Sequence, residues 1–207
     1  MKNIKNIILD LGGVLINLDY NKANVELGKL GLMNTFTKAK QIELFDKLEE
    51  GKISDAKFLT QLNQLASDTK NNDILIQAWN SILLDFPANR LSLLKSLNSK
   101  YRLFLFSNTN SIHIKEVYKK LKKAHDVENL NTYFEKVYLS HELGIRKPKP
   151  EGFKHILHSN EIIPNETLFI DDSPQHITGA KEVGIRAEWL NLEKEDIHGI
   201  LKRLSLI

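Results

Sequence analysis

The sequence contains no cysteine and no long apolar run. The absence of cysteine excludes disulfide bridges and thiolate metal sites, and it fits a reducing compartment without proving one. The N-terminal apolar run Ile7-Ile8-Leu9 stops at Asp10, far short of a signal-peptide core or a membrane span. We therefore expect a cytoplasmic protein that does not associate with membranes.

An excess of charge of one sign is also missing. The chain has 29 Lys and Arg against 26 Asp and Glu, and the resulting net charge of +3 is too small and dispersed to indicate nucleic-acid binding. We interpret the lysine-rich stretch 115–123 as the solvent-facing side of a helix, because Ile112, Val117 and Leu121 supply its apolar contacts. No nucleic-acid partner is expected.

Five short runs of residues typical of β-strands are present, and helical segments separate the later ones. This alternation predicts a parallel sheet with crossover helices. The runs are Ile4–Leu9, Arg102–Phe106, Lys136–Leu139, Thr167–Ile170 and Arg186–Leu190. Helices are expected after Pro87, from Ser111, from about Pro150 and after Glu193.

The stretch 18–85 has no convincing strand, and it predicts four helices inserted between the first and second strands. Their expected cores are Ala23–Leu30, Thr37–Glu49, Ser54–Leu65 and Ile74–Leu83. A chain of 207 residues is long enough for one α/β core with a small inserted module. The predicted organisation is a core domain at 1–17 and 86–207 with a helical domain at 18–85.

Polar residues follow several of these runs. In open α/β sheets, ligands bind beyond the carboxyl ends of the strands. Asp10 follows Ile7-Ile8-Leu9 and precedes Gly12 and Gly13. A carboxylate there is either a helix N-cap or a nucleophile and metal ligand. The glycines favour an anion site, because they let backbone N–H groups come close to an anion.

Ser107 and Lys147 are each open to two interpretations, a purely structural one and a role in binding phosphate. Ser107 follows an apolar run and, taken alone, is better explained as a helix cap than as a phosphate ligand. As a phosphate ligand it would donate its hydroxyl, and Asn108 would add an amide. A loop lysine is usually solvated, but Lys147 precedes Pro148, and a cation held in a stiff loop is suited to neutralising phosphate.

Asp171 and Asp172 follow the apolar run Leu168-Phe169-Ile170. Two adjacent acids repel each other unless a cation or a lysine offsets their charge. Magnesium prefers one or two protein carboxylates together with waters and a substrate phosphate. Asp10 and Asp172 are therefore the right kind and number of ligands for Mg²⁺.

The four motifs together resemble the haloacid dehalogenase-like superfamily, in which a nucleophilic Asp, a Ser or Thr, a Lys and an acidic pair occur in this order. The resemblance covers essentially the whole chain. The strings LDLGGVLINLDY, GKIS, FSNTN, LGIRKPKPEGFKHIL and DDS look like bacterial sugar phosphatases of the α-glucose-1-phosphatase type. They resemble, less closely, the phosphatase domain of mammalian soluble epoxide hydrolases. The implied fold is α/β, a Rossmann-like three-layer parallel sheet with a mobile four-helix cap over the carboxyl ends of the strands.

The resemblance also implies roles for individual residues. Asp10 would attack phosphorus and form an aspartyl-phosphate that water hydrolyses. The carboxylates of Asp10 and Asp172 and the carbonyl of Gly12 would bind Mg²⁺, and Asp171 would orient Lys147 or a metal-bound water. The residues expected to contact the phosphorylated substrate are Leu11, Gly12, Ser107, Asn108 and Lys147. The expected partner is a small phosphorylated metabolite such as a hexose 1-phosphate, bound by a monomer or homodimer.

One position departs from the usual pattern. Phosphatases of this superfamily usually carry a second Asp two residues after the nucleophile, as general acid and base, and here that residue is Gly12. General acid–base catalysis is worth about 10² to 10⁴-fold, although the α-glucose-1-phosphatase relatives share the glycine. An anomeric leaving group needs less proton donation, which favours sugar 1-phosphates. His176 is either a proton shuttle or, more ordinarily, a histidine on the surface of a helix.

Two other functions remain open. A 2-haloacid dehalogenase would attack carbon with Asp10 and need no metal, but Asp171 and Asp172 without Mg²⁺ would repel its anionic substrate. A catalytically silent phosphosugar-binding protein is the second alternative, because Gly12 removes the usual acid. Within the helical domain, we expect the loop Glu50-Gly51-Lys52 and Trp79 to lie near the cleft, although Trp79 fits the core of that domain equally well.

Overall fold

The structure, a computed structural model, describes residues 3–33, 35 and 41–207. Five parallel strands form one sheet in the order β3-β2-β1-β4-β5. They are β1 (Asn6–Leu9), β2 (Arg102–Ser107), β3 (Lys136–Leu139), β4 (Thr167–Asp171) and β5 (Arg186–Trp189). All five predicted strands are confirmed, and their ends agree with the prediction to within two residues.

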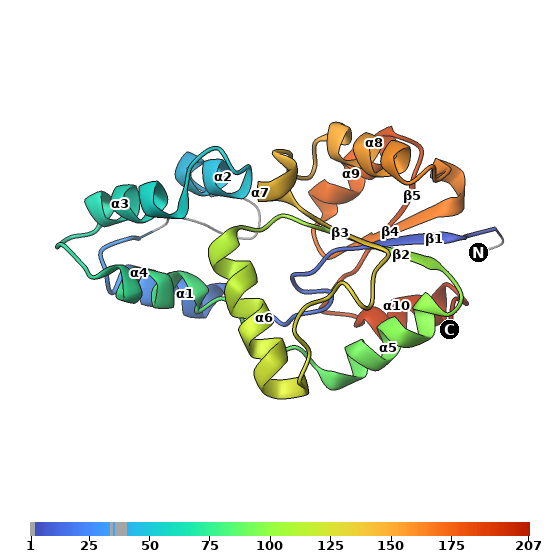
Figure 1. Cartoon of the computed structure of the whole chain (residues 1–207), viewed down its shortest axis with the longest axis horizontal. Helices are drawn as coiled ribbons and strands as arrows, with labels where there is room; N and C mark the ends of the chain where they lie inside the picture. The colour runs from blue at the N-terminus through green and yellow to red at the C-terminus, as the bar shows by residue number, and fades with distance from the viewer. Residues whose placement is uncertain (1–2, 34, 36–40) are drawn as a thin grey trace.

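Helices cover both faces of the sheet, which confirms the predicted three-layer α/β fold (Figure 1). One layer contains α5 (Ala88–Asn98), α6 (Ser111–His125) and α10 (Ile197–Arg203), and the other contains α8 (Pro150–Ser159) and α9 (Pro174–Glu182). The short helix α7 (Ser140–Leu143) follows β3 directly and has no counterpart among the helices expected from the sequence. A 3₁₀ turn at Pro164–Glu166 precedes β4.

The central strand explains why the N-terminal run is apolar throughout. Ile7, Ile8 and Leu9 are fully buried, as expected for a parallel strand covered on both faces. Ile7 and Leu9 belong to the apolar cluster on the side of α5, whereas Ile8 packs with Phe104 and Phe169 on the side of α8. Successive side chains of β1 therefore pack into the two apolar clusters in turn, and Asp10 follows at the carboxyl edge of the sheet.

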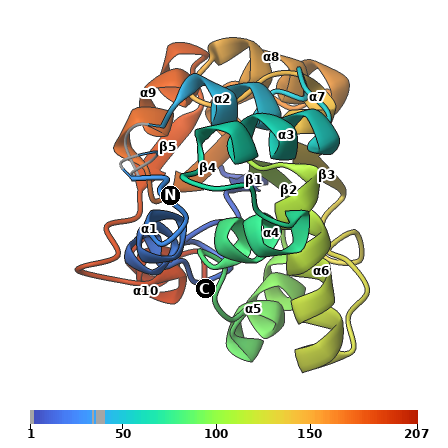
Figure 2. The ribbon, with the colours of Figure 1, turned by 90° about the vertical axis from the view of Figure 1, so that its left-hand side faces the viewer.

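A group of helices lies beside the carboxyl ends of the strands, on the left of Figure 1. It contains α1 (Tyr20–Gly28), α2 (Glu43–Glu49), α3 (Asp55–Leu65) and α4 (Asn72–Asn80), and we call it the insert. Figure 2 shows the insert from its outer side, with α1 beside α4 and α2 beside α3. The rings of Phe45, Phe58 and Trp79 form its core.

Four helices are thus found where the sequence predicts them, with one correction. Residues 37–40 of the predicted helix Thr37–Glu49 lie outside the described residues. Of the remainder, the helix begins at Glu43, because Ile42 has extended backbone. Two chain segments connect the insert to the sheet, and they run side by side, with Leu84 N donating to Asn17 O at 2.9 Å. The domain boundaries at 17/18 and 85/86 stay a prediction.

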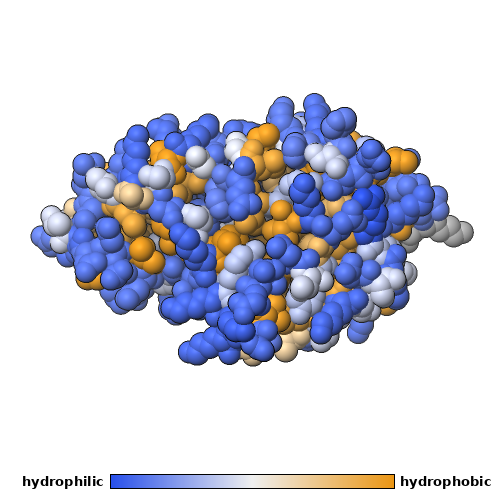
Figure 3. All heavy atoms as spheres, viewed as in Figure 1, coloured by the Kyte–Doolittle hydropathy of each residue, from blue (hydrophilic) through white to orange (hydrophobic). Residues whose placement is uncertain are grey.

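The described face of the molecule in Figure 3 is mainly hydrophilic, with scattered hydrophobic patches. In the described part of the chain, no helix combines the length and the apolar character that crossing a membrane requires.

Candidate active site

The carboxyl ends of three neighbouring strands bring the predicted residues together. Asp10 follows β1, Ser107 ends β2, and Asp171 ends β4 with Asp172 next to it. Because β1 pairs in parallel with both β2 and β4, these ends meet at one edge of the sheet. All four side chains are buried, although Asp and Ser are mostly exposed residue types. Lys147 reaches the same edge from the loop between α7 and α8, and only 1% of it is exposed.

Lys147 connects two of the carboxylates. Its Nζ lies 2.6 Å from Asp10 Oδ1 and 2.6 Å from Asp171 Oδ2. Although burial disfavours the charged form, these two acids raise the pKa of Lys147 above its ordinary value. The interpretation of Lys147 as a solvated loop residue is therefore wrong.

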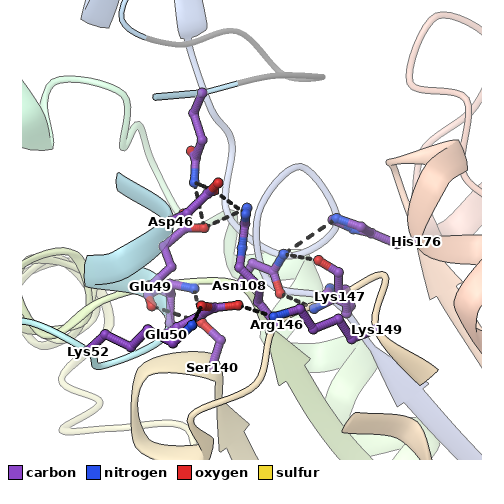
Figure 4. A network of polar contacts seen from close by, with 12 residues as sticks. Asp46, Glu49, Glu50, Lys52, Asn108, Ser140, Arg146, Lys147, Lys149 and His176 are labelled. Carbon is purple, nitrogen blue, oxygen red and sulfur yellow. Dashed lines mark hydrogen bonds and ion pairs between the residues drawn. The ribbon is translucent and has the colours of Figure 1, made fainter. Parts of the chain in front are cut away.

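Asn108 holds the main chain of Lys147 in place (Figure 4). The Lys147 N–H donates to Asn108 Oδ1 at 2.8 Å, and Asn108 Nδ2 donates to the Lys147 carbonyl at 2.9 Å. The amide that the sequence assigned to a phosphate thus bonds to the loop of Lys147. Asn108 also lines the cavity described below, so a contact with a ligand stays a prediction.

Both oxygens of Asp171 have donors. Oδ2 bonds to Lys147, and Oδ1 accepts from the backbone N–H of Ser173 at 2.8 Å. His176 Nδ1 lies 3.0 Å from each oxygen. Burial works to raise the pKa of Asp171, but Lys147 and His176 outweigh it and hold that pKa well below its ordinary range. Asp171 is therefore a charged residue that orients its neighbours.

His176 is not a histidine on the surface of a helix, and that interpretation is wrong. It lies in the first turn of α9, and its side chain is 13% exposed. Because α9 starts just after the acid pair, the His176 side chain lies against the carboxylate of Asp171, whereas Pro174 and Gln175 of the same turn are exposed. Burial lowers the pKa of His176, which favours a neutral ring that donates from Nδ1 to Asp171.

The surroundings of Asp10 disfavour its charged form, in contrast to those of Asp171. Burial raises the pKa of its carboxyl to about 7; Lys147 works against that rise, while Asp171 and Asp172 add to it. Oxygens of Asp10, Asp171 and Asp172 lie within 4.8 Å of one another. Lys147 contacts two of these three acids, and its single positive charge cannot offset the negative charge of all three.

A divalent cation fits this donor set. Within the described residues, no donor bonds to Asp10 Oδ2, whereas both oxygens of Asp171 are engaged. Asp10 and Asp172 are thus the candidate carboxylate ligands, and Gly12 lies beside them in the same cavity wall. Oxygen ligands of this kind and number suit Mg²⁺. Within this set, Asp171 would act on the ligands without binding the cation.

Helix capping does not explain the buried acids and hydroxyl. The residues after Asp10 form a tight turn, and Asp19 is the cap of α1, accepting from Lys22 N–H at 2.9 Å. Asn110 is the cap of α6, accepting from His113 N–H at 3.0 Å. The capping interpretations of Asp10 and Ser107 are therefore wrong.

A cavity of about 140 Å³ lies between the sheet edge and the insert. Asp10, Leu11, Gly12, Ser107, Asn108, Asp172 and His176 line it, whereas Lys147 and Asp171 lie behind its wall. The insert contributes Gln41, Glu49 and Trp79. The site thus has acidic residues suited to a cation at the sheet edge, and residues of the insert form the other side of the cavity.

Both interpretations of Trp79 hold, because it lines the cavity and also packs against Phe45 at a ring-centroid distance of 4.4 Å. The loop Glu50-Gly51-Lys52 contacts the core beside the cavity rather than lining it. A Cβ on Gly51 would lie 2.1 Å from the carbonyl oxygen of His141, so only glycine fits this contact.

The cavity wall also includes residues that were not singled out from the sequence, among them Tyr20, Glu49 and Arg146. Arg146 precedes Lys147 in the stiff loop, and this position was a usable signal. Glu49 had none, because a charged residue on an amphipathic helix is normally assigned to the solvent-facing side.

Gly13 provides a direct test of the carboxylate arrangement. Its φ is +72°, and a Cβ there would lie 2.3 Å from Asp172 Oδ2. We expect Gly13→Ala to weaken Mg²⁺ binding at least about tenfold, because the methyl group must displace the carboxylate of a cation ligand. Isothermal titration calorimetry with MgCl₂ measures this change.

Gly144→Ala is the matched control. Gly144 has a φ of +75°, and a Cβ there meets no heavy atom within 4 Å. Both variants therefore carry the strain of a left-handed backbone, about 1–2 kcal/mol, but only one disturbs Asp172. Equal Mg²⁺ affinities for the two variants would contradict the assigned geometry.

Comparison with known protein families gives one match that spans most of the chain. The model of the family "Haloacid dehalogenase-like hydrolase" matches residues 7–189.

Among curated proteins, the chain is similar to D-ribitol-5-phosphate phosphatase from Bacteroides thetaiotaomicron, with 36% identity over 184 residues. The match covers 87% of this chain and 89% of the relative. A glyceraldehyde 3-phosphate phosphatase from Pyrococcus furiosus is 30% identical over 113 residues, which cover 54% of this chain and 44% of that protein.

Among solved structures, the chain is similar to a HAD family enzyme from Bacteroides thetaiotaomicron in complex with magnesium and inorganic phosphate. The TM-score is 0.84 and the identity 38%, and the match covers 94% of this chain and 98% of that one. A predicted HAD-like hydrolase from Porphyromonas gingivalis has a TM-score of 0.87 at 29% identity, with 98% of both chains covered.

Proposed function

Since the chain belongs to the haloacid dehalogenase-like hydrolase family, we propose that it is a Mg²⁺-dependent phosphatase that hydrolyses small sugar or polyol phosphates through a covalent intermediate on Asp10. The observation that carries the proposal is the convergence of Asp10, Asp172 and Lys147 at one buried sheet edge. The similar enzyme with magnesium and inorganic phosphate and the relative named D-ribitol-5-phosphate phosphatase support it.

The residues divide the chemistry between them. One carboxylate oxygen of Asp10 attacks phosphorus, the P–O bond to the alcohol breaks, and the alcohol oxygen takes up a proton from solvent. Water then attacks the phosphorus of the aspartyl-phosphate, which releases inorganic phosphate and regenerates the carboxylate. Ser107 donates its hydroxyl to the phosphoryl group, and Lys147 offsets the charge of Asp10 beside it. When bound by Asp10, Asp172 and the Gly12 carbonyl, Mg²⁺ supplies positive charge for the phosphate oxygens. Asp171 and His176 keep the ammonium group of Lys147 in place.

Because Gly12 has no side chain, this position offers no acid to protonate the leaving group. A Cβ at this position would lie 2.8 Å from Leu18 Cδ1, so the Leu18 side chain occupies the space of the usual acid–base Asp. Esters with acidic leaving groups, such as p-nitrophenyl phosphate and sugar 1-phosphates, need the least proton donation. The named relative nevertheless acts on a polyol 5-phosphate, so the proposal includes both ester classes.

Phosphate release from p-nitrophenyl phosphate, glucose 1-phosphate and D-ribitol 5-phosphate tests the proposal. We expect turnover with MgCl₂, loss of turnover in EDTA, and recovery when MgCl₂ is restored in excess. Binding of a sugar phosphate without any phosphate release would favour the catalytically silent protein. Halide release from a 2-haloacid in EDTA would favour the dehalogenase.

We further propose that the enzyme is cytoplasmic and acts as a monomer or homodimer. Its partners would be small phosphorylated metabolites rather than nucleic acids or membranes, and the nearly balanced charge supports the exclusion of nucleic acids. Size-exclusion chromatography with light scattering tests the oligomeric state.

A further inference from the structure

Glu49 brings a carboxylate into the cavity from the side opposite Asp10. It is the last residue of α2, its side chain is 11% exposed, and it lines the same cavity as Asp10 and Ser107. Its Oε2 accepts from Gln41 Nε2 at 2.9 Å and from Arg146 Nη2 at 2.8 Å. Among the residues that the structure describes, no donor bonds to Oε1. One oxygen of a nearly buried carboxylate is therefore left for a ligand.

Arg146 fixes this carboxylate relative to the phosphate end of the site. It is the residue before Lys147, and it pairs with both Asp46 and Glu49 (Figure 4). Its Nε is buried and, in the described part of the chain, has no acceptor. A buried donor without a partner is costly in a protein without a ligand, and Glu49 in the same cavity wall has an acceptor oxygen to spare. Hydroxyl groups, which both donate and accept, match such a pair.

The charged residues that line the cavity favour an uncharged organic group on the substrate over an anionic one. Among the described residues that line the cavity, Arg146 is the only Lys or Arg. Its guanidinium already pairs with the carboxylates of Asp46 and Glu49. A second anionic group on a substrate would meet Glu49 without a cation of its own, and such a contact is repulsive. Burial raises the pKa of Glu49, while the contacts with Arg146 and Gln41 favour its charged form. An uncharged hydroxyl would donate a charge-assisted hydrogen bond to this carboxylate.

We propose that Glu49 selects the organic part of the substrate, accepting a hydroxyl of an uncharged sugar or polyol and disfavouring esters that carry a second anionic group. This inference rests on the proposed phosphatase function.

A matched pair of esters tests the selection. Sorbitol 6-phosphate and 6-phosphogluconate differ at C1, where one has a hydroxymethyl group and the other a carboxylate. We expect the wild-type enzyme to prefer sorbitol 6-phosphate by at least about tenfold in kcat/KM. A wild-type enzyme that hydrolyses both equally well would overturn the role of Glu49, whatever the variants do.

Glu49→Gln keeps the shape of the side chain and removes its charge. We expect the preference for sorbitol 6-phosphate to fall at least about tenfold, mainly through KM. The readout is the ratio of the kcat/KM values for the two esters, so a loss of activity that is common to both esters does not affect it. An unchanged preference in Glu49→Gln would overturn the inference.

Asp46→Asn is the control, because it removes the other ion pair of Arg146 at a residue that does not line the cavity. Its preference should match that of the wild type. An equal change in Asp46→Asn and Glu49→Gln would show that only the link between insert and core matters, and would overturn a direct contact. Absence of wild-type turnover of p-nitrophenyl phosphate would overturn the phosphatase function itself, and the selection with it.

Discussion

Asp10→Asn is expected to lower kcat at least about 10⁴-fold on every phosphate ester, because an amide oxygen cannot act as the nucleophile. The side chain keeps its shape, so the β1 edge and the cavity should stay in place. Steady-state phosphate release with saturating MgCl₂ measures the loss. Turnover within about tenfold of the wild type would exclude a covalent intermediate on Asp10.

The same variant should not be less stable than the wild type. Burial raises the pKa of Asp10 to about 7, so at neutral pH the folded state disfavours its charged form relative to the unfolded chain. A neutral asparagine removes that cost. Without Mg²⁺, we expect the free energy of unfolding to rise by about 1–3 kcal/mol, measured by urea denaturation. A large loss of stability would instead attribute the missing activity to unfolding.

Lys147→Met is expected to reduce both activity and stability. The Nζ atom is fully buried between Asp10 and Asp171, and removing it leaves two buried carboxylates without their cation. Breaking such a buried pair typically costs about 3–5 kcal/mol. We expect kcat to fall about 10³-fold, because the charge of Asp10 and of the approaching phosphate is no longer offset. Phosphate release and urea denaturation measure the two effects.

Two further variants separate these effects. In Asp10→Asn/Lys147→Met one of the uncompensated charges is gone, so stability should recover in part while activity stays absent. Lys149→Met is the matched control, because Lys149 is half exposed and pairs with Glu50 outside the cavity. It should cost at most about 1 kcal/mol and leave kcat unchanged. Equal losses in Lys147→Met and Lys149→Met would contradict the special position of Lys147.

The sheet was predictable because its signals are local. An apolar run such as Ile7-Ile8-Leu9 is typical of a strand covered on both faces. The strand predicted there, Ile4–Leu9, starts two residues before β1 and ends at the same residue. The helix boundaries in the insert were harder, since Ile42 continues an apolar pattern but has extended backbone. The short helix α7 spans four residues, too few for any periodicity to identify.

The edge of the sheet was predictable for a related reason. Parallel strands place all their carboxyl ends together, so polar residues after Leu9, Phe106 and Ile170 had to converge once the strands were assigned. The pattern did not reveal that His176 is mostly buried, because its burial depends on how α9 packs against Asp171. Nor did it reveal that both amide atoms of Asn108 bond to Lys147.

The amino-acid sequence alone determined the α/β class, the helical insert and the residues gathered at the strand ends, because each follows from short-range patterns and from the geometry of a parallel sheet. Only the tertiary structure decided which side chains face Asp10 across the cavity. Glu49 and Arg146 lie far apart in the chain, and a charged residue becomes a buried ligand or a solvated one according to the element that packs opposite it.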